Sequence, residues 1–481
     1  MMRAAAVAPL EHVPIFPSDP ERFRALLGDR YVEVEAAIST ARRALAGRAV
    51  WHINSTATGG GVAEMLQSLL AYARGAGADM RWVVIEGDAE FFAITKRIHN
   101  HLHDSPGDGG ELGEAERAAY ERTLAANAAE LSSLVREGDI VYLHDPQTAG
   151  LTEAMQDRGA LVVWRCHVGV DRPGPIARRC WDFLRGWVRS ADAIVFSRRD
   201  FAWTGLDPER IWIVPPSIDA FSPKNQDMDP DSVDAILAAA GIAQDGGTVP
   251  AFVRLDGSPG RVNRMARVEQ VARIPREVPL VAQVSRWDRL KDPIGVLRGF
   301  ADHCPVPDAH LVIAGPQVEK VSDDPEGAEV LAEVRVERES LPAEARARTH
   351  LASLPMEDVE ENAAIVNAIQ RRASVVVQKS IAEGFGLTVA EAMWKARPVV
   401  ASRVGGIRDQ IVDGESGVLL DDPSDLVGFG VAVTGLLRDP DRAHRIGEAA
   451  RQRVGERFLG WRHLLQYVAL LSDLLARKGR G

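Results

Sequence analysis

The chain has 481 residues, of which 46% are hydrophobic and 26% are charged, and its formal net charge is −11. This length exceeds what one hydrophobic core usually serves, so we expect a soluble globular protein with two domains. The acidic balance argues against a nucleic-acid partner. No apolar run reaches the length of a membrane span, so we expect no membrane insertion.

The beginning of the chain and its cysteines bear on the cellular compartment. The stretch M-M-R-A-A-A-V-A-P-L-E is interrupted by Pro9 and Glu11, which is unlike a signal peptide. Cys166, Cys180 and Cys304 lie far apart and lack the spacing of metal ligands. These features predict buried free thiols in a cytoplasmic protein.

Apolar runs alternate with helical patterns in the first half of the chain. Residues 1–48 are predicted to be helical and peripheral, and a helix of regularly spaced apolar residues follows the first clear strand. The strands are expected at Ala49–Asn54, Arg81–Glu86, Ile140–His144, Leu161–Arg165, Ala193–Phe196 and Ile211–Val214. This alternation predicts a doubly wound parallel sheet with ligands at the carboxyl ends of the strands.

Pro215-Pro216 interrupts the pattern and is predicted to form a hinge. Residues 244–279 are rich in Gly, Pro and Arg, which predicts an insertion or a long surface loop. A second series of strands is expected at Leu280–Ser285, His310–Gly315, Val375–Gln378 and Pro398–Ala401. The simplest architecture is two α/β domains, residues 1–215 and 216–459, facing across a cleft. We expect the last helix, within 460–481, to pack back on the first domain.

One stretch, Q-K-S-I-A-E-G-F-G-L-T-V-A-E-A-M-W at 378–394, combines a strand end, a glycine loop and a helix start. Free backbone N–H groups at a helix start favour an anion, and the carboxylates of Glu383 and Glu391 can accept hydrogen bonds from hydroxyl groups. A sugar joined to a phosphate or diphosphate meets both demands. Glu391 also has a structural interpretation, because Thr388-Val-Ala-Glu391 is typical of a capping box in the first helical turn.

The first strand of the second series is followed by Arg286 and Lys291, at the same predicted sheet edge as the glycine loop. A cationic pair beside a helix start would stabilise a departing diphosphate. The alternative is a solvated charged loop, which is usual for Arg and Lys. The position at a strand end favours the ligand interpretation.

Three strand ends in the first half carry candidate polar residues. Gly59-Gly60-Gly61 precedes a helix with Glu64 and predicts either a backbone cradle for a phosphate or sugar, or a tight turn. The glycine spacing matches neither G-x-G-x-x-G nor a P-loop. His167 ends one strand and His144 another, and a lone histidine is more often structural than catalytic.

Two further groups offer weak metal-site patterns. His99 and His103 share a helical face. Asp227-Met-Asp-Pro-Asp231 contains Asp-x-Asp, but it more simply caps the helix that follows. We therefore expect no metal site.

Read together, the glycine loop, Arg286 with Lys291, and the E-x7-E pair around G-F-G-L resemble the retaining glycosyltransferases of family 4, which have the GT-B fold of two Rossmann-like domains. Longer matches point to trehalose-forming members of that family. They are H-I-N-S-T-A-T-G-G-G-V-A-E (52–64), E-G-D-A-E-F-F-A-I-T-K-R-I-H-N (86–100), H-D-P-Q (144–147), W-R-C-H (164–167), P-P-S-I-D (215–219), E-G-F-G-L-T-V-A-E-A-M-W (383–394) and V-G-G-I-R-D-Q-I-V-D-G-E-S-G (404–417). The 244–279 segment departs from the pattern and leaves the acceptor open.

The resemblance implies a role for each matching residue. In the donor site, Arg286 and Lys291 would bind the diphosphate, Glu391 the ribose and Glu383 the sugar hydroxyls. The other implied donor contacts are Gly60, Gly61, Gly384, Phe385, Gly386, Leu387 and Thr388. His167 would contact the donor glucose near the reacting carbon. The implied acceptor residues are Asn54, Glu86, His144, Asp145 and Gln147.

The expected activity is transfer of glucose, with retention, from a nucleoside diphosphate glucose (UDP- or ADP-glucose) to a sugar acceptor. Glucose as acceptor would give trehalose. No cofactor is expected, and a homodimer is one possible assembly. A retaining trehalose phosphorylase is the enzymatic alternative, and a non-catalytic sugar-nucleotide sensor is the alternative of another class.

Overall fold

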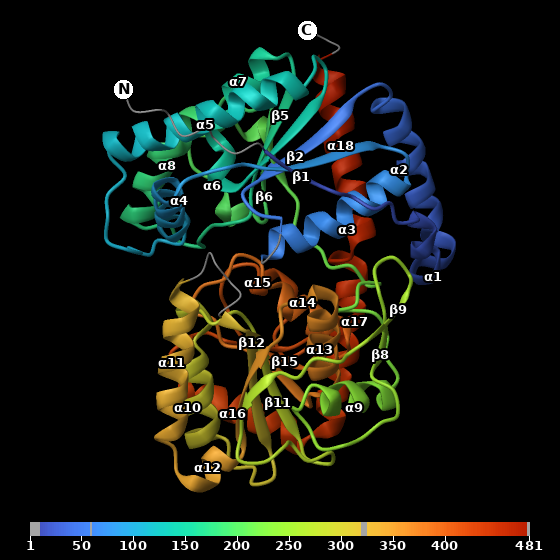
Figure 1. Ribbon diagram of the computed structural model, residues 1–481, viewed down its shortest axis with the longest axis vertical. Helices are drawn as coiled ribbons and strands as arrows, with labels where there is room; N and C mark the ends of the chain where they lie inside the picture. The colour runs from blue at the N-terminus through green and yellow to red at the C-terminus, as the bar shows by residue number, and fades with distance from the viewer. Residues whose placement is uncertain (1–9, 58–59, 319–324, 479–481) are drawn as a thin grey trace. The chain divides into compact units, whose positions relative to one another are not determined.

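The computed structural model describes residues 10–57, 60–318 and 325–478 (Figure 1). The chain divides into two compact units. The first unit combines Met1–Pro216 with Gly460–Gly481, and the second is Ser217–Leu459. Two segments far apart in sequence therefore build the first unit.

The first unit contains a seven-stranded sheet in the order β1-β3-β2-β4-β5-β6-β7. Its strands are β1 (Glu11–Val13), β2 (Ala49–Asn54), β3 (Asp79–Val84), β4 (Ile140–His144), β5 (Leu161–Cys166), β6 (Ala193–Phe196) and β7 (Ile211–Ile213). All neighbours are parallel except β1 and β3. Asn54 pairs with Val84, and His144 with Arg165, the last residue but one of β5, so these strands end at one edge.

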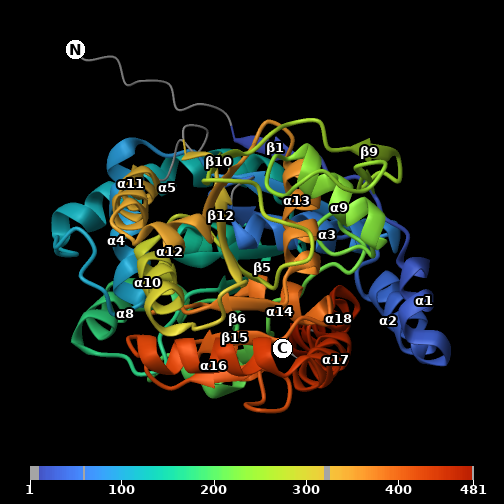
Figure 2. The same cartoon turned by 90° about the horizontal axis from the view of Figure 1, so that it is seen from below.

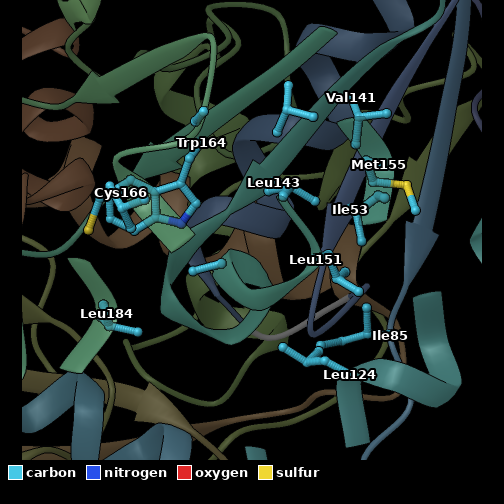
Figure 3. Packing of buried hydrophobic residues seen from close by; sticks show 14 of the residues in the cluster. Ile53, Ile85, Leu124, Val141, Leu143, Leu151, Met155, Trp164, Cys166 and Leu184 are labelled. Atoms are coloured by element: carbon cyan, nitrogen blue, oxygen red, sulfur yellow. The ribbon is translucent and has the colours of Figure 1, made fainter. Parts of the chain in front are cut away.

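Side chains that alternate along these strands enter two different cores. In β4, Val141 and Leu143 face a core covered by α4, α5, α7 and α8, part of which is seen in Figure 3. Ile140 and Tyr142 face the opposite core, covered by α3 and α18, and α18 also packs on α2. The helices are α1 (Arg24–Leu27), α2 (Tyr31–Ala44), α3 (Gly61–Gly75), α4 (Ala89–Leu102), α5 (Glu114–Leu134), α6 (Asp145–Thr148), α7 (Thr152–Asp157), α8 (Pro175–Val188) and α18 (Gly460–Lys478).

The second unit contains a seven-stranded sheet in the order β10-β13-β12-β11-β14-β15-β16. Its strands are β10 (Arg267–Glu269), β11 (Leu280–Val284), β12 (His310–Pro316), β13 (Thr349–Leu354), β14 (Val375–Gln378), β15 (Val399–Ser402) and β16 (Val418–Leu420). Only β10 runs antiparallel to its neighbour among the described strands of this sheet. This sheet has the same doubly wound, mostly parallel character as the first.

Helices cover both faces of the second sheet. One core is formed with α10, α11 and α16, and Figure 2 shows α10 and α11 on one side of β12 with α13 and α9 on the other. The helices are α9 (Pro230–Ala239), α10 (Pro293–His303), α11 (Pro325–Glu339), α12 (Ala343–Ala347), α13 (Val359–Arg372), α14 (Leu387–Trp394), α15 (Ile407–Gln410), α16 (Leu426–Arg438) and α17 (Pro440–Arg457).

Several sequence predictions need correction. The strand predicted at Arg81–Glu86 is Asp79–Val84, and the predicted helical region before residue 48 contains β1. Strands β13 and β16 were not predicted. The 244–279 segment is not merely a surface loop, because β10 joins the main sheet, while β8 (Ala251–Val253) and β9 (Pro259–Arg261) form a hairpin.

Candidate active site

Lys291 and Glu383 meet at the carboxyl edge of the second sheet. Lys291 lies in a 3-10 turn after β11, and Glu383 lies in the loop after β14, which is paired with β11. Lys291 Nζ donates to Glu383 Oε2 over 2.5 Å, and both side chains are mostly buried. Two residues 92 apart in sequence thus form one charged pair where the sequence predicted a donor site.

A second ion pair joins the same two loops. Lys379, the first residue after β14, pairs with Asp292, which follows Lys291. Asp292 adopts a left-handed backbone conformation (φ 47°) and also caps α10 by accepting from Gly295 N. The lysine side chain is wholly buried, so this ion pair ties the two loops to each other. Neither residue was singled out from the sequence.

The glycine loop ends in Gly386, which has φ 85° and is the N-cap of α14. Its carbonyl accepts from the backbone N–H groups of Val389 and Ala390. Thr388 therefore lies inside the helix, and its hydroxyl donates to Gln378 Oε1 at 3.4 Å. The predicted capping box is wrong, since Glu391 lies in the second turn and not at N3. Helix capping does not explain Glu391.

A second glycine pair, Gly405-Gly406, packs against the backbone of this loop. Gly406 N donates to Gly384 O at 3.0 Å, and a Cβ on Gly405 would lie 1.6 Å from Glu383 O. Buried Gln410 donates to the carbonyls of Phe385 and Gly386. These supports come from the V-G-G-I-R-D-Q stretch, which the sequence marked only by resemblance.

Glu391 is buried within the second unit. Its side chain is 2% exposed, and Oε1 lies 3.7 Å from Lys224 Nζ. Lys224 comes from the segment just after the unit begins and was missed by sequence reasoning. A buried carboxylate beside a lysine is a polar arrangement that a hydrophobic core alone would not require.

Arg286 lies two residues beyond β11, as predicted. Its guanidinium donates to Asp288 at 3.1 Å, and its side chain is 45% exposed. Asp288 also accepts from Leu290 N and so shapes the turn that carries Lys291. Arg286 is therefore a half-exposed cation at the sheet edge that also carries the Lys291–Glu383 pair.

His167, His144 and Asp145 come together at the carboxyl edge of the first sheet. Nδ1 of His144 lies 3.3 Å from Nε2 of His167, and Asp145 Oδ1 accepts from His167 N at 2.7 Å. Asp145 has φ 62°, a left-handed conformation that costs free energy for a residue other than glycine. Desolvation raises the pKa of Asp145 to about 7.

Gln147 lies in the short helix α6 that begins at Asp145. Its Oε1 is buried and has no hydrogen-bond donor within the described residues. A buried amide oxygen without a partner is costly unless a ligand or water satisfies it. This observation agrees with a polar ligand near Gln147.

Asn54 and Glu86 also lie at this edge, but each is held by the protein itself. Asn54 donates to Thr56 O at 2.7 Å and accepts from Trp82 Nε1 at 2.9 Å. Glu86 N donates to Oδ1 of buried Asn127, and Nδ2 of Asn127 donates to Glu86 O. The main chain of Glu86 is thereby fixed by a residue that sequence reasoning missed.

The glycine triplet is partly outside the description, since Gly59 is not among the described residues. Gly60 is the N-cap of α3 and Gly61 is its first residue, so the helix starts where the sequence predicted, which fits both the cradle and the tight turn. Glu64 lies exposed in the first turn. The helix start thus follows the carboxyl end of β2 at the same edge as His144.

The residues of the two weak metal-site patterns contact near neighbours in the sequence. Asp229 caps α9 by accepting from Ser232 N, and His99 stacks edge-on against His103. Within the described ranges, no three His, Cys, Asp or Glu residues are grouped so that they could hold a metal ion. No helix in that part of the chain is long and apolar enough to span a membrane.

Comparison with known proteins covers both halves of the chain. The family described as "Trehalose synthase, N-terminal domain" matches residues 52–203, and "Glycosyl transferases group 1" matches residues 266–453. A trehalose synthase from Pyrococcus horikoshii is 34% identical over 459 residues, covering 94% of this chain and 96% of that protein. A trehalose phosphorylase from Pleurotus pulmonarius is 24% identical over 428 residues, covering 84% of this chain and 54% of that protein.

Among solved structures, an α,α-trehalose-phosphate synthase (UDP-forming) from Burkholderia vietnamiensis aligns with a TM-score of 0.64 at 14% identity. The alignment covers 89% of this chain and 100% of that one. Two Rossmann-like sheets and this likeness define the class: the protein has the fold of the GT-B glycosyltransferases. More particularly, the chain belongs to the trehalose synthase family. The family and fold predicted from the sequence are confirmed.

Proposed function

We propose that this glycosyltransferase moves glucose from a nucleoside diphosphate glucose to glucose and forms trehalose with retention at the anomeric carbon. The observation that carries the proposal is the Lys291–Glu383 pair, formed by two loops at the sheet edge from which Arg286 and the loop leading into α14 also emerge. It offers cations and helix N–H groups to a diphosphate, and a carboxylate to sugar hydroxyls.

The proposed chemistry depends on stabilising the leaving group. As the bond from glucose to the diphosphate breaks, negative charge grows on the phosphate oxygens, where Lys291, Arg286 and the α14 N–H groups stabilise it. When the donor binds, before this bond breaks, Lys291 exchanges Glu383 for the phosphate, and Glu383 becomes free to accept from sugar hydroxyls. Attack from the same face, with the leaving phosphate accepting the acceptor's proton, gives retention.

The test incubates the protein with UDP-, ADP- or GDP-glucose and a panel of sugars, then identifies products by chromatography and the anomeric linkage by NMR. Trehalose formed with release of the nucleoside diphosphate supports the proposal. Absence of donor consumption and of any glucosylated product across the panel would overturn it. Tight donor binding without turnover would instead support the sensor.

A trehalose phosphorylase is the second candidate, favoured by the similarity to the Pleurotus enzyme. Glu391 separates the two, because a ribose is present only in the nucleotide reaction. Glu391→Gln should raise the KM for the nucleotide donor by about tenfold, equivalent to about 1.4 kcal/mol. In a phosphorylase, the same variant would leave phosphate-driven trehalose cleavage nearly unchanged.

A further inference from the structure

One fully buried arginine in the first unit is bonded to aromatic side chains instead of a carboxylate. Arg165 Nε lies 3.0 Å from Nε2 of His167, and one terminal nitrogen lies 3.0 Å from Nε2 of His463 and 2.6 Å from the Tyr467 hydroxyl. The other terminal nitrogen donates to Val214 O. Across the described residues Arg165 makes no ion pair, so its donors orient these rings.

These contacts determine which ring nitrogen of His167 carries the hydrogen. A guanidinium has only donors and stays protonated in proteins, so Nε2 of His167 must be the acceptor. Burial and the charge of Arg165 hold the pKa of His167 well below its usual value, and the ring is neutral. Its hydrogen therefore lies on Nδ1, which has no acceptor among the described residues.

The neighbouring histidines are consistent with this assignment. Nδ1 of His144 faces the same Nε2 of His167, and Nε2 of His144 lies 2.9 Å from Nδ1 of His52. If Nε2 of His167 accepts, His144 donates through Nδ1 and accepts from His52 through Nε2. Burial lowers the pKa of His52 to about 3 and that of His144 well below its usual value, so each ring is neutral.

The main chain of His167 is held as firmly as its ring. Asp145 Oδ1 accepts from His167 N, and Trp164 Nε1 donates to Asp145 O at 3.1 Å. The ring itself is stacked on His144 with centroids 5.6 Å apart. His167 is 9% exposed, so the residue is fixed on several sides but is not wholly enclosed.

We propose that Arg165, together with His463 and Tyr467 of α18, positions His167 as a neutral Nδ1–H donor to an acceptor oxygen of the bound hexose. Arg165 is a positioning residue, because it acts through His167. The identity of the hexose rests on the proposed function, whereas the ring orientation does not. The last helix of the first unit would then be part of its ligand site.

The direct test is NMR of ¹⁵N-histidine-labelled full-length protein without ligand, with the His167 signals assigned by their loss in His167→Gln. The expected spectrum shows hydrogen on Nδ1 of His167 and no titration from pH 6 to 8. The groups facing the ring are Arg165, His144, Asp145 and, through Arg165, His463 and Tyr467. Hydrogen on Nε2 of His167 in the unsubstituted protein would overturn the proposal.

Variants test the role of Arg165 and α18. Arg165→Met should give a mixture of the two His167 tautomers, and Tyr467→Phe a smaller shift toward that mixture. His463→Gln keeps an acceptor for Arg165 and should leave the His167 spectrum unchanged, whereas His463→Leu should alter it. An unchanged His167 spectrum in both Tyr467→Phe and His463→Leu would contradict the positioning role, even if Arg165→Met fails to fold.

Kinetics supply an independent readout if the protein turns over a nucleoside diphosphate glucose. Tyr467→Phe and His463→Leu should lower kcat, by up to about 10²-fold, with little change in donor KM, since misplacement of a positioned group acts mainly on the reacting complex. A fall in thermal stability with unchanged kcat would indicate a purely structural network and overturn the proposal. If no donor is consumed, the proposed function fails. The tautomer measurement still decides whether Arg165 and α18 position His167.

Discussion

Lys379 and Asp292 form an ion pair in which the lysine side chain is completely buried, and Asp292 directly follows Lys291. Removing one member of such a pair leaves the other charge without its partner. Lys379→Met should therefore lower the free energy of unfolding by about 3 kcal/mol, near the lower end of the usual range because Asp292 is partly exposed.

Denaturant or thermal unfolding measures this cost. Arg289→Ala is the matched control, since it removes half-exposed ion pairs to Glu326 and Glu333 in the same region. The control should change stability by less than about 1 kcal/mol. Equal losses in the two variants would show that the buried pair has no special importance.

The Lys291–Glu383 pair predicts coupling between two substitutions. Lys291→Met should lower kcat by about 10²- to 10³-fold if the ammonium stabilises the leaving diphosphate. Glu383→Gln should also lower kcat, and the double variant should lose less than the product of the two factors, because the residues touch. Steady-state kinetics of all three variants measure this, with exposed Lys96→Met as control. Strictly multiplicative losses would argue against the exchange of partners proposed for Lys291.

The buried histidines predict a loss of stability in mild acid. The pKa of His52 is lowered to about 3 by burial, and those of His144 and His463 are also lowered by burial. The unfolded chain takes up these protons as the pH falls through 6.5, whereas the folded chain does not. The stability that these neutral histidines contribute is thus fully present above pH 6.5 and is lost as the pH falls toward 3.

His52→Gln should consequently lose less melting temperature between pH 7.5 and pH 5.0 than the unsubstituted protein, by at least about 3 °C. The exposed His444→Gln should behave like the unsubstituted protein. Comparing variants is necessary because Asp145 acts in the opposite direction. Its pKa is raised to about 7 in the folded protein, so the folded state takes up a proton and gains stability as the pH falls from 7 toward the pKa of the unfolded chain. A parallel fall in all three proteins would refute the assignment to His52.

Glu361 predicts how the 244–279 segment is attached. This buried carboxylate accepts from the backbone N–H groups of Asn263 and Arg264 and pairs with the Arg264 side chain. Glu361→Gln should expose the segment and raise the rate of limited trypsin cleavage near Arg264 several-fold. The exposed Glu344→Gln in α12 serves as control. Cleavage at an unchanged rate would mean that the segment is held mainly by β10.

Much of the fold could be predicted because buried parallel strands are continuous apolar runs. Strands β2, β4, β6 and β14 have the predicted bounds. Strand β13 was missed because Thr349, His350 and Ser353 interrupt its apolar character, although every residue in it is buried. His350 is accommodated by His310 and Gln270, which no local pattern reveals.

A candidate residue could be located from the sequence where it directly follows a strand, as with His167, whereas Glu383 lies in the loop five residues beyond β14 and not at the strand end. Asp292 and Lys379 escaped notice because they are 87 residues apart and each looks like an ordinary loop residue. Arg165 did carry a signal, since an arginine inside V-V-W-R-C needs buried partners. Those partners, His463 and Tyr467, lie about 300 residues later.

The first unit combines an early and a late segment of the chain, so a ribosome completes this unit only after it has made the second one. Strands β1–β7 are complete by Pro216, but α18, which covers one face of their sheet, follows only after Leu459. At usual translation speeds, the intervening residues take roughly 10 to 50 s to synthesise. During that time the nascent first sheet lacks part of its cover, and buried Arg165 lacks two of its partners. The nascent chain is then a natural client for a chaperone that binds apolar surface.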